Sequence, residues 1–224
     1  MSKYHKLFKE YLKEYGHLYE KDALEAIKED FNNEGYMRPE GTFDICNQIY
    51  SKIGILDSKK NIYLKSLNYL ENSFDINCNI LEVGSGMFPE MARIIKSRQK
   101  KGSITCIDPD LLFQEYQGLT LMKKELTEDF DLTPYDLIVS IMPCEATPTI
   151  IKLANKYDKN LYLQMCGCVH INSGGFNPFT YGYSYYLWQD YVKNIAESTL
   201  PNNRELLITE EDDLPYPLIR TIKK

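Results

Sequence analysis

The feature that most constrains the fold is an alternation of strand and helix patterns that begins near residue 79. Short β-rich runs occupy residues 79–83, 103–108, 119–123, 135–141 and 160–166. Between them, apolar residues recur at helical spacing near 89–101, 109–117 and 145–158,. Strands that alternate with helices predict a parallel sheet with helices on both faces.

The C-terminal segment has a different pattern. A helix is expected around residues 184–199, and two further β-rich runs, RELLITEE and YPLIRTIKK, are separated only by DDLP. This spacing predicts an antiparallel pair at the end of the sheet. The predicted fold class is therefore α/β: a doubly wound, mostly parallel seven-stranded sheet with an antiparallel C-terminal hairpin. Such a sheet binds ligands beyond the carboxyl ends of its strands, where the strand order reverses beside the first strand.

The first 75 residues show helical patterns only. The clearest are Thr42–Ile53, followed by Gly54, and Asp57–Phe74, where Asp57 is a plausible N-cap,. A length of 224 residues suits one full-sized core with an extension,. We therefore predict an N-terminal helical cap over residues 1–75, a candidate lid, and a doubly wound domain over residues 76–224.

Composition narrows the range of partners. The net charge of −6 provides no bulk attraction for a polyanion, so nucleic acid is not an expected partner,. No run approaches the roughly 18 to 20 apolar residues that a membrane span needs, and the charged N-terminus lacks a secretory signal,. The six cysteines are scattered, as expected for reduced thiols,. We expect a cytoplasmic protein; the oligomeric state is not indicated.

The first predicted strand ends in a glycine loop. Gly84 and Gly86 can adopt backbone angles and approach a ligand in ways that side chains forbid,. Pro89 suits the first position of the next helix, where a missing N–H costs nothing. The free N–H groups at the start of that helix would face a ligand in the crevice.

An acid follows the second predicted strand. Asp108 lies 22 residues after Gly86, close to the position from which a carboxylate holds both hydroxyls of a ribose,. Alternatively, the glycines form a plain turn, and Asp108 with Pro109 forms an N-cap followed by proline at the first helical position. The combination of strand, loop, helix and acid favours a nucleoside site.

The loop sequence resembles the first motif of the class I S-adenosylmethionine-dependent methyltransferases. That motif is an acid, a variable residue and then glycines at alternate positions, which Glu82–Met87 matches, although Phe88 takes the place of the third glycine. In that family the glycine loop packs against the methionine part of the cofactor, and the acid after the second strand holds the ribose. The resemblance, which extends in element order over residues 79–223, implies these roles for Glu82, Gly84, Gly86 and Asp108.

The predicted cofactor is therefore S-adenosylmethionine, and residues 76–224 would form a Rossmann-like methyltransferase domain that acts on a small-molecule acceptor. Its predicted contacts come from the loop after the first strand, the acid after the second and the tip of the fourth: Glu82, Gly84, Ser85, Gly86, Met87, Phe88, Asp108, Pro109, Ser140 and Met142.

Two alternatives stay open. A nicotinamide-dependent oxidoreductase would need glycine where the chain has Pro89, and carboxylates at Glu82 and Glu90 would oppose a pyrophosphate but suit a sulfonium,. A nucleoside-binding module without catalysis would account for Phe88 and for the absence of an acceptor motif after the fourth strand. Family members that methylate amide or ring nitrogens often carry Asp or Asn, two prolines and an aromatic residue there, whereas this chain has SIMPCE.

No catalytic residue is predicted. Cys144 and Glu145 could act as nucleophile or base, but an acid at the start of a helix is equally a favourable partner for the helix dipole,. Methyl transfer from a sulfonium needs mainly alignment of the acceptor with the methyl carbon.

No metal site is predicted either. Cys166 and His170 would lie about 13 Å apart on an extended strand, too far for one ion,. Asn177-Pro178-Phe179 resembles the acceptor motif but follows the fifth strand, and we interpret it as a turn,. The aromatic residues nearby could cover the substrate, with Phe176, Phe179, Tyr181, Tyr183 and Trp188. Alternatively, Tyr185, Tyr186, Trp188 and Tyr191 form a helix face that packs on the sheet, and we favour a covering loop followed by a packing helix,.

Overall fold

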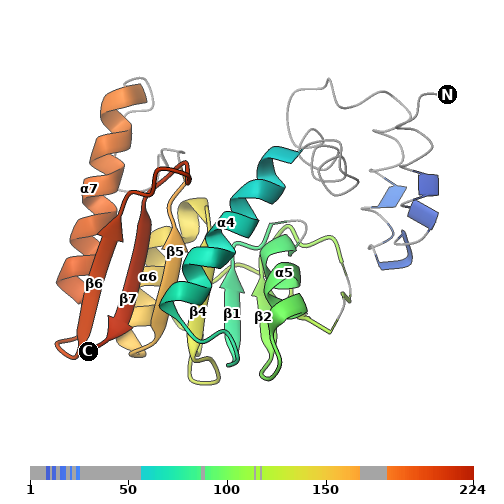
Figure 1. The fold of residues 1–224 in the computed structure, drawn as a ribbon, viewed down its shortest axis with the longest axis horizontal. Helices are drawn as coiled ribbons and strands as arrows, with labels where there is room; N and C mark the ends of the chain where they lie inside the picture. Colours follow the sequence, from blue (N-terminus) through green and yellow to red (C-terminus); the bar gives the residue numbers. More distant parts are fainter. Residues whose placement is uncertain are drawn as a thin grey trace.

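The computed structural model describes residues 57–86, 89–113, 115–116, 118–166 and 181–224, together with a few positions between residues 9 and 25 (Figure 1). The helix predicted over Thr42–Ile53, the loop residues Met87 and Phe88, and the segment Asn177–Phe179 lie outside the described residues. In the described part of the chain, no helix is both long enough and apolar enough to cross a bilayer.

The sheet has seven strands in the order β3-β2-β1-β4-β5-β7-β6. Six strands run parallel, and β7 is antiparallel to its two neighbours, β5 and β6. The predicted doubly wound sheet with an antiparallel C-terminal hairpin is therefore confirmed. All seven predicted strands are present: β1 (Ile80–Val83), β2 (Ile104–Ile107), β3 (Thr120–Met122), β4 (Leu137–Ile141), β5 (Asn160–Gln164), β6 (Arg204–Thr209) and β7 (Leu218–Lys223).

Helices cover both faces of this sheet. Figure 1 shows α4 and α5 in front of the strands and α6 and α7 behind them. The described helices are α4 (Asp57–Ser73), α5 (Glu90–Arg98), α6 (Thr147–Lys156) and α7 (Tyr181–Thr199), with short 3-10 turns η1 (Gly16–Leu18) and η3 (Cys144–Ala146). Each of the four helices overlaps a predicted helical segment.

The helix predicted over residues 109–117 is wrong. The chain there makes a turn in which Asp108 Oδ1 accepts the N–H of Asp110 at 2.8 Å, and Tyr116 and Leu119 form an isolated antiparallel bridge. The consecutive residues 111–113 are all buried, whereas a surface helix would expose one of three neighbours,. The two rings nearby, Phe113 and Tyr116, pack with centroids 4.6 Å apart. Burial of adjacent apolar side chains has overridden the helical spacing.

Strand pleating divides the core into two layers. Ile80 of β1 contributes to the cluster on the α4 and α5 side, and Leu81 contributes to the cluster on the α6 and α7 side,. The central strands β1, β2 and β4 are buried at every position, as expected for parallel strands covered on both faces,. The core therefore holds the carboxyl ends of these strands at one rigid edge.

Helix α4, which belongs to the predicted N-terminal cap, packs on the sheet. Leu67 and Leu70 are fully buried in the first cluster. Ser66 Oγ donates to Gln164 Oε1 at 2.8 Å, and the hydroxyl of Tyr162 donates to the carbonyl of Ser66 at 2.9 Å. The domain boundary after residue 75 stays a prediction, but the last helix before it shares the core of the sheet.

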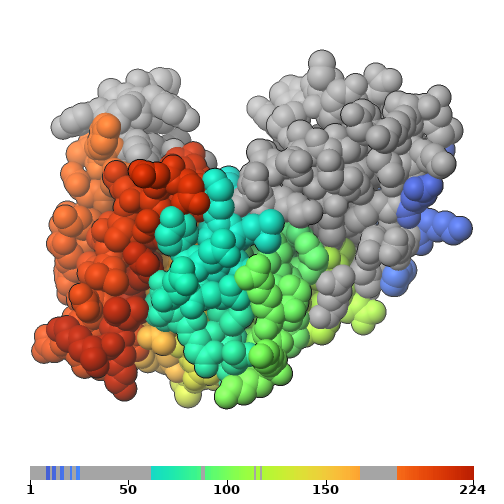
Figure 2. Space-filling view, in the orientation of Figure 1, coloured from blue at the N-terminus to red at the C-terminus, as the bar shows by residue number. Residues whose placement is uncertain are grey.

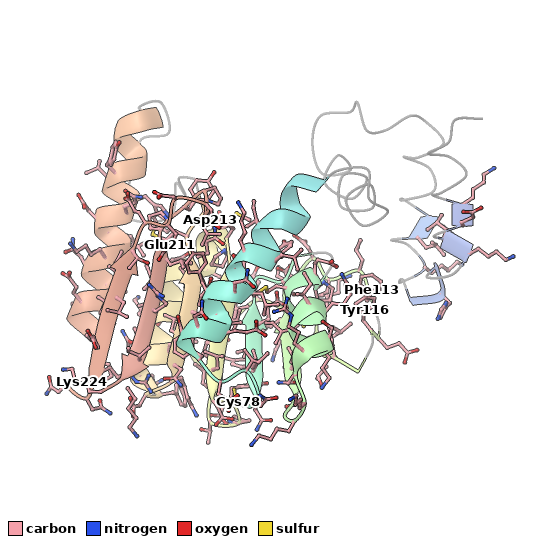
Figure 3. The ribbon with its side chains drawn as sticks, viewed as in Figure 1. Cys78, Phe113, Tyr116, Glu211, Asp213 and Lys224 are labelled. Atoms are coloured by element: carbon pink, nitrogen blue, oxygen red, sulfur yellow. The ribbon has the colours of Figure 1, made fainter. Side chains whose placement is uncertain are left out.

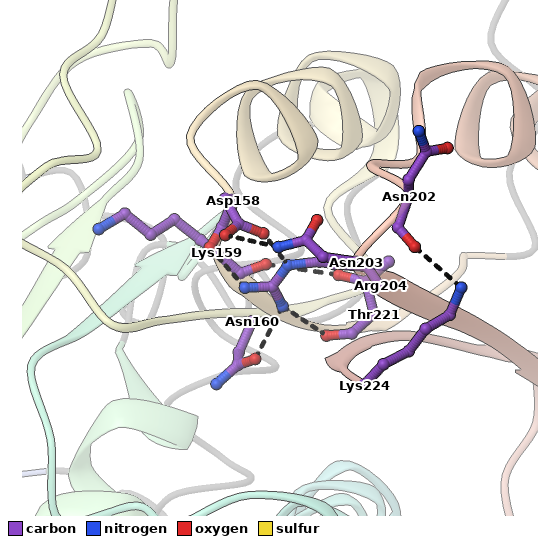
Figure 4. Close-up of polar contacts among 8 residues, drawn as sticks. All are labelled: Asp158, Lys159, Asn160, Asn202, Asn203, Arg204, Thr221 and Lys224. Carbon is purple, nitrogen blue, oxygen red and sulfur yellow. Dashed lines mark hydrogen bonds and ion pairs between the residues drawn. The ribbon is translucent and has the colours of Figure 1, made fainter.

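The amino edge of the sheet is tied together by a buried arginine (Figure 4). Arg204, only 4% exposed, donates from Nε to Asp158 Oδ1 at 2.6 Å and from its terminal nitrogens to Asn160 Oδ1 at 2.8 Å, to the carbonyl of Thr221 at 3.4 Å and to the carbonyl of Asp158. Asn203 adds a further hydrogen bond to Asp158. This network links the starts of β5 and β6 to β7.

Candidate functional site

A cavity of about 720 Å³ lies where the strand order reverses. Strand β1 pairs with β2 on one side and β4 on the other, so the loops that follow these strands diverge beyond the carboxyl edge,. In Figure 3 Cys78 and Lys224 mark the opposite, amino edge of the sheet. The lining residues follow β1 to β4: Val83, Gly84, Gly86, Ile107, Asp108, Pro109, Asp110, Lys124, Glu125, Leu126, Met142, Pro143, Cys144, Glu145, Ala146 and Thr149.

The glycine loop forms one wall of this cavity. Gly84 and Gly86 have φ angles of +70° and +69°, in the left-handed region where glycine is unstrained,. A Cβ atom added at Gly84 would lie 3.0 Å from both Cα and Cβ of Pro143, so the loop after β4 packs directly on this glycine. A Cβ at Gly86 would meet nothing within 4 Å. The first glycine thus permits a close backbone contact, and the second leaves open space.

Asp108 connects the second strand to the glycine loop. Its Oδ2 accepts the N–H of Gly86 at 2.8 Å, and its Oδ1 accepts the N–H of Asp110 at 2.8 Å. Burial raises the pKa of Asp108, and the two N–H donors oppose that shift. A carboxylate has about four acceptor positions, so capacity for a ligand's hydroxyl groups remains. The structure therefore brings together the loop and the acid that the sequence singled out.

Glu82 lies away from the cavity wall. Its side chain is 3% exposed, and its Oε2 accepts the N–H of Ala92 in helix α5 at 3.2 Å and the thiol of Cys106 at 3.5 Å. Burial raises the pKa of Glu82 to about 8, although both hydrogen bonds act in the opposite direction. Burial likewise raises the pKa of Cys106. The carboxyl group connects the glycine-loop strand to α5, and its predicted contact with a cofactor stays a prediction.

Of the other predicted cofactor contacts that the structure describes, two line the cavity and two do not. Pro109 and Met142 line the cavity. Ser140 is buried beneath it and donates from Oγ to the carbonyl of Val83 at 2.6 Å, which satisfies the last carbonyl of β1. Ser85 is buried, and its Oγ has no hydrogen-bond partner. The contacts expected of Met87 and Phe88 lie outside the described residues.

The loop after β4 is strained. Met142 and Cys144 have φ angles of +55° and +53°, which cost an ordinary residue roughly 1 to 2 kcal/mol each,. Met142 is held by donation of its N–H to the carbonyl of Gln164 at 2.8 Å, and the carbonyl of Cys144 accepts the Thr147 hydroxyl at 2.8 Å. Strain of this kind collects at ligand sites. Here it keeps Pro143 against the glycine loop.

The cavity includes a segment that the sequence analysis missed. Lys124, Glu125 and Leu126 follow β3 and line the cavity together with Thr149 of α6. The sequence could have indicated this segment, because ligands bind beyond the carboxyl ends of parallel strands and β3 ends at the same edge as β1 and β2. Among the described residues, the lining includes four acids, Asp108, Asp110, Glu125 and Glu145, and one base, Lys124.

Two further predictions concern the chain after β5. Among the described residues, no group of three or more His, Cys, Asp and Glu side chains could hold a metal ion, while residues 167–170 of the Cys–His stretch lie outside that description. In α7, Trp188 is fully buried in the second cluster and Tyr191 packs against it, as predicted for the helix face. Tyr186 is 67% exposed, so its predicted packing is wrong. It lies on the side of α7 turned away from the core.

Comparisons in sequence give no match to a protein-family model or to a curated protein. In structure, the chain is similar to a protein from Methanococcus maripaludis provisionally named an S-adenosyl-L-methionine-dependent methyltransferase, with a TM-score of 0.51, 14% identity and coverage of 84% of this chain and 97% of that one.

Two other solved structures have lower scores. The plantazolicin methyltransferase BpumL in complex with SAH has a TM-score of 0.49, 12% identity and coverage of 90% and 98% of the two chains. A methyltransferase from Pyrococcus furiosus has a TM-score of 0.48, 10% identity and coverage of 72% and 82%. The strand order and the Methanococcus maripaludis comparison together show that this chain has the class I Rossmann-like methyltransferase fold.

Proposed function

We propose that this chain is an S-adenosylmethionine-dependent methyltransferase whose acceptor is a small molecule. The observation that carries the proposal is the pairing of Asp108 with the glycine loop at the strand-order reversal, beside a cavity of about 720 Å³. This volume lies within the roughly 300 to 1,000 Å³ of ordinary small-molecule sites. A ribose held by Asp108 would lie beside the backbone of Gly86.

The cavity suits this cofactor in shape and in charge. Gly86 leaves open space at the wall, and the unused acceptor positions of Asp108 match the two hydroxyls of a ribose,. The described lining residues include four acids and one base, a balance that favours a sulfonium over a pyrophosphate,. The same charge balance argues against the nicotinamide alternative and against a polyanionic acceptor such as RNA.

Bound S-adenosylmethionine supplies an electrophilic methyl group, which an acceptor lone pair takes while the S–C electron pair remains on sulfur. The residues of the chain supply orientation. Asp108 would hold the ribose of the cofactor beside the glycine loop, and Pro143 packs on that loop between β1 and β4. Methyl transfer of this type is accelerated mainly by alignment of the reacting atoms. Met142 and Cys144, on either side of Pro143, are the described residues best placed to shape the acceptor's approach.

The proposal also gives roles to the other predicted residues and to the N-terminal region. Glu82 and Ser140 would support the cofactor loop from below, through α5 and through Val83, while Ser85, Met87 and Phe88 would complete the loop itself. Residues 1–75 would act as a cap, supported by the hydrogen bonds from Tyr69 Oη to Asp213 Oδ1 at 2.7 Å and from Lys65 Nζ to the Asp213 carbonyl at 3.0 Å, which hold α4 to the β6–β7 loop.

A second candidate is a nucleoside-binding module without catalysis. It is favoured by the segment Met142–Glu145, which carries none of the polar and aromatic residues of the nitrogen-acceptor motif. The two candidate functions differ in whether binding of the cofactor is followed by methyl transfer. Methyl transfer to any acceptor would exclude the silent module, and tight binding without transfer would support it.

Calorimetric titration with S-adenosylmethionine, S-adenosylhomocysteine and NAD tests the proposal. We expect both sulfur nucleosides to bind, NAD not to bind, and Asp108→Asn to weaken both sulfur nucleosides. Labelled methyl groups, offered with a metabolite extract or with total RNA, would then identify the acceptor class. Failure of both sulfur nucleosides to bind would refute the proposed function.

A further inference from the structure

A buried amide lies at the carboxyl end of β5, next to the strand that ends at the cavity. Gln164 is the last residue of β5 and pairs with Ile141, the last residue of β4. The carbonyl of Gln164 accepts the N–H of Met142, which lines the cavity, at 2.8 Å. Neighbouring strands are about 4.8 Å apart, so the end of β5 belongs to the surroundings of the cavity.

Only one end of this amide is paired within the part of the chain that the structure describes. Gln164 is fully buried, and its Oε1 accepts the hydroxyl of Ser66 in α4 at 2.8 Å. Its Nε2, which carries the two N–H donors of the amide, has no hydrogen-bond partner among the described residues,. Burial of unpaired donors is unfavourable because their hydrogen bonds to water are lost. Such a group at the edge where ligands bind is suited to recognise one.

The amide lies on the α4 side of the sheet. Tyr162, two residues earlier and therefore on the same face of β5, belongs to the core cluster of that side and donates to the carbonyl of Ser66 at 2.9 Å,. Met142 packs against the same cluster and also lines the cavity. Met142 thus connects the surroundings of Gln164 with the cavity. An unbranched methionine adapts its shape readily, so it can yield to a ligand that reaches the amide.

The order of the strands leaves this side to the acceptor. Asp108, the proposed ribose ligand, follows β2, and the glycine loop follows β1. The sheet continues from β1 through β4 to β5, so Gln164 and Asp108 lie on opposite sides of the glycine loop. We propose that Gln164 recognises the methyl acceptor by donating from its amide to a carbonyl oxygen close to the atom that is methylated. This inference rests on the proposed function and adds the chemical class of the acceptor.

The carbonyl group of the acceptor should be uncharged. An amide donor has no charge to offer a carboxylate, and burial of an unpaired charge is costly. Arg220 of β7, which pairs with Tyr162, already has a carboxylate beside it, since its Nη2 lies 3.6 Å from Glu211 Oε1. Ketones, amides and esters therefore suit Gln164 better than free carboxylic acids. The amide only orients the acceptor: the nucleophilic atom bonds to the methyl carbon, the S–C electron pair stays on sulfur, and the acceptor's proton passes to water.

The test compares two variants with the wild type. Gln164→Met keeps the length and the unbranched shape of the side chain but removes both donors. The control, Tyr162→Phe, removes a neighbouring buried hydrogen bond to α4 and leaves the amide in place. Methyl-labelled S-adenosylmethionine is offered with two panels of small molecules that carry amino or hydroxyl groups. One panel consists of ketones, amides and esters, and the other of molecules of similar size without a carbonyl group.

The wild type should methylate members of the carbonyl panel in preference to the other panel. For the best acceptor, Gln164→Met should lower kcat/KM by about tenfold or more, as expected when one buried hydrogen bond to the substrate is lost. Its affinity for S-adenosylmethionine, measured by calorimetric titration, should not change. Its midpoint of thermal unfolding should stay within about 3 °C of the wild type or rise, because the donors that it removes have no partner in the described fold,. Tyr162→Phe should keep kcat/KM.

Several results would overturn the inference and leave the proposed function standing, provided that the wild type binds S-adenosylmethionine. These are equal use of the two panels, transfer to the second panel alone or to neither, and equal losses of kcat/KM in the two variants. A midpoint that falls by more than about 3 °C in Gln164→Met would also overturn it, because the amide would then serve the fold. Failure of both S-adenosylmethionine and S-adenosylhomocysteine to bind would refute the proposed function and the inference together.

Discussion

The two edges of the sheet treat their polar groups in opposite ways. At the amino edge, the guanidinium of Arg204 is matched by oxygens of Asp158, Asn160 and Thr221. At the carboxyl edge, the buried Glu82 accepts hydrogen bonds from Ala92 and Cys106, and Ser85 Oγ has no partner among the described residues. The charged group at the amino edge is thus satisfied within the protein, whereas the glycine loop at the carboxyl edge has polar capacity left for a ligand.

Backbone strain follows the same division. At the carboxyl edge, Met142 and Cys144 occupy the left-handed region although neither residue type favours it,. At the amino edge the non-glycine residue in this region, among those the structure describes, is Asp158, a type that tolerates this conformation and is held by Arg204,. Figure 2 shows the described surfaces of α4 and α5 continuous across the front of the sheet, between these two edges. Strain is therefore placed where the cavity needs a particular loop shape.

The largest expected effect on stability is at the amino edge. Arg204→Ala should lower the free energy of unfolding by about 3 kcal/mol, because it removes a buried side chain together with its hydrogen bonds to Asp158, Asn160 and the buried carbonyl of Thr221,. Urea denaturation measures this loss, and the affinity for S-adenosylmethionine should not change. The control is Arg98→Ala, which breaks the half-exposed pair with Glu71 and should cost less than 1 kcal/mol,. Equal losses in the two variants would contradict the contrast between the edges.

The largest expected effect on binding is at the carboxyl edge. Asp108→Asn should weaken S-adenosylmethionine about 100-fold, equivalent to about 2.7 kcal/mol, because an amide cannot accept from Gly86, Asp110 and a ribose together,. Calorimetric titration measures the affinity. Asp136→Asn serves as the control, since Asp136 Oδ2 accepts the N–H of Asn79 at the amino edge. Unchanged affinity in Asp108→Asn would show that Asp108 does not hold the ribose of the cofactor.

A glycine comparison tests the contact between the loops. Gly84→Ala should lower the free energy of unfolding by about 2 kcal/mol, through its left-handed backbone and its contact with Pro143, and should also impair ligand binding,. Gly118→Ala has a similar φ angle of +74° but open space around it, so only the backbone cost of about 1 kcal/mol should remain,. Thermal unfolding with and without ligand measures both effects. Similar results for the two variants would mean that the contact with Pro143 is unimportant.

The last expected effect is a dependence of the free energy of unfolding on pH. The pKa of Glu82 is raised from 4.5 to about 8 by burial, so its contribution to stability is fully present below pH 4.5 and is lost as pH rises through about 8,. Relative to Glu82→Gln, the wild type should therefore become less stable between pH 4.5 and pH 8.5 by several kcal/mol, since each unit of pKa difference corresponds to about 1.4 kcal/mol. Urea denaturation across this range measures the difference. A constant difference would mean that Glu82 is ionised in the folded protein.

Local patterns in the sequence were enough to predict most of the fold. The alternation of β-rich and helical runs identified all seven strands, and the spacing between Gly86 and Asp108 predicted that both would belong to one site, where the structure joins them by a hydrogen bond. These features depend on neighbouring residues and on the general rule that parallel strands end at one edge. The helix predicted over residues 109–117 failed because burial of three consecutive apolar residues depends on what packs around them.

The sequence by itself determined the order of strands and helices, the glycine loop and the acid that follows the second strand, since each is encoded by residues close together in the chain. Only the tertiary structure decided that Glu82 turns toward α5, that Pro143 packs on Gly84, and that residues 124–126 complete the cavity wall. The physical reason is that these contacts join separate strands, whose spacing and register are fixed by sheet pairing and core packing rather than by local sequence.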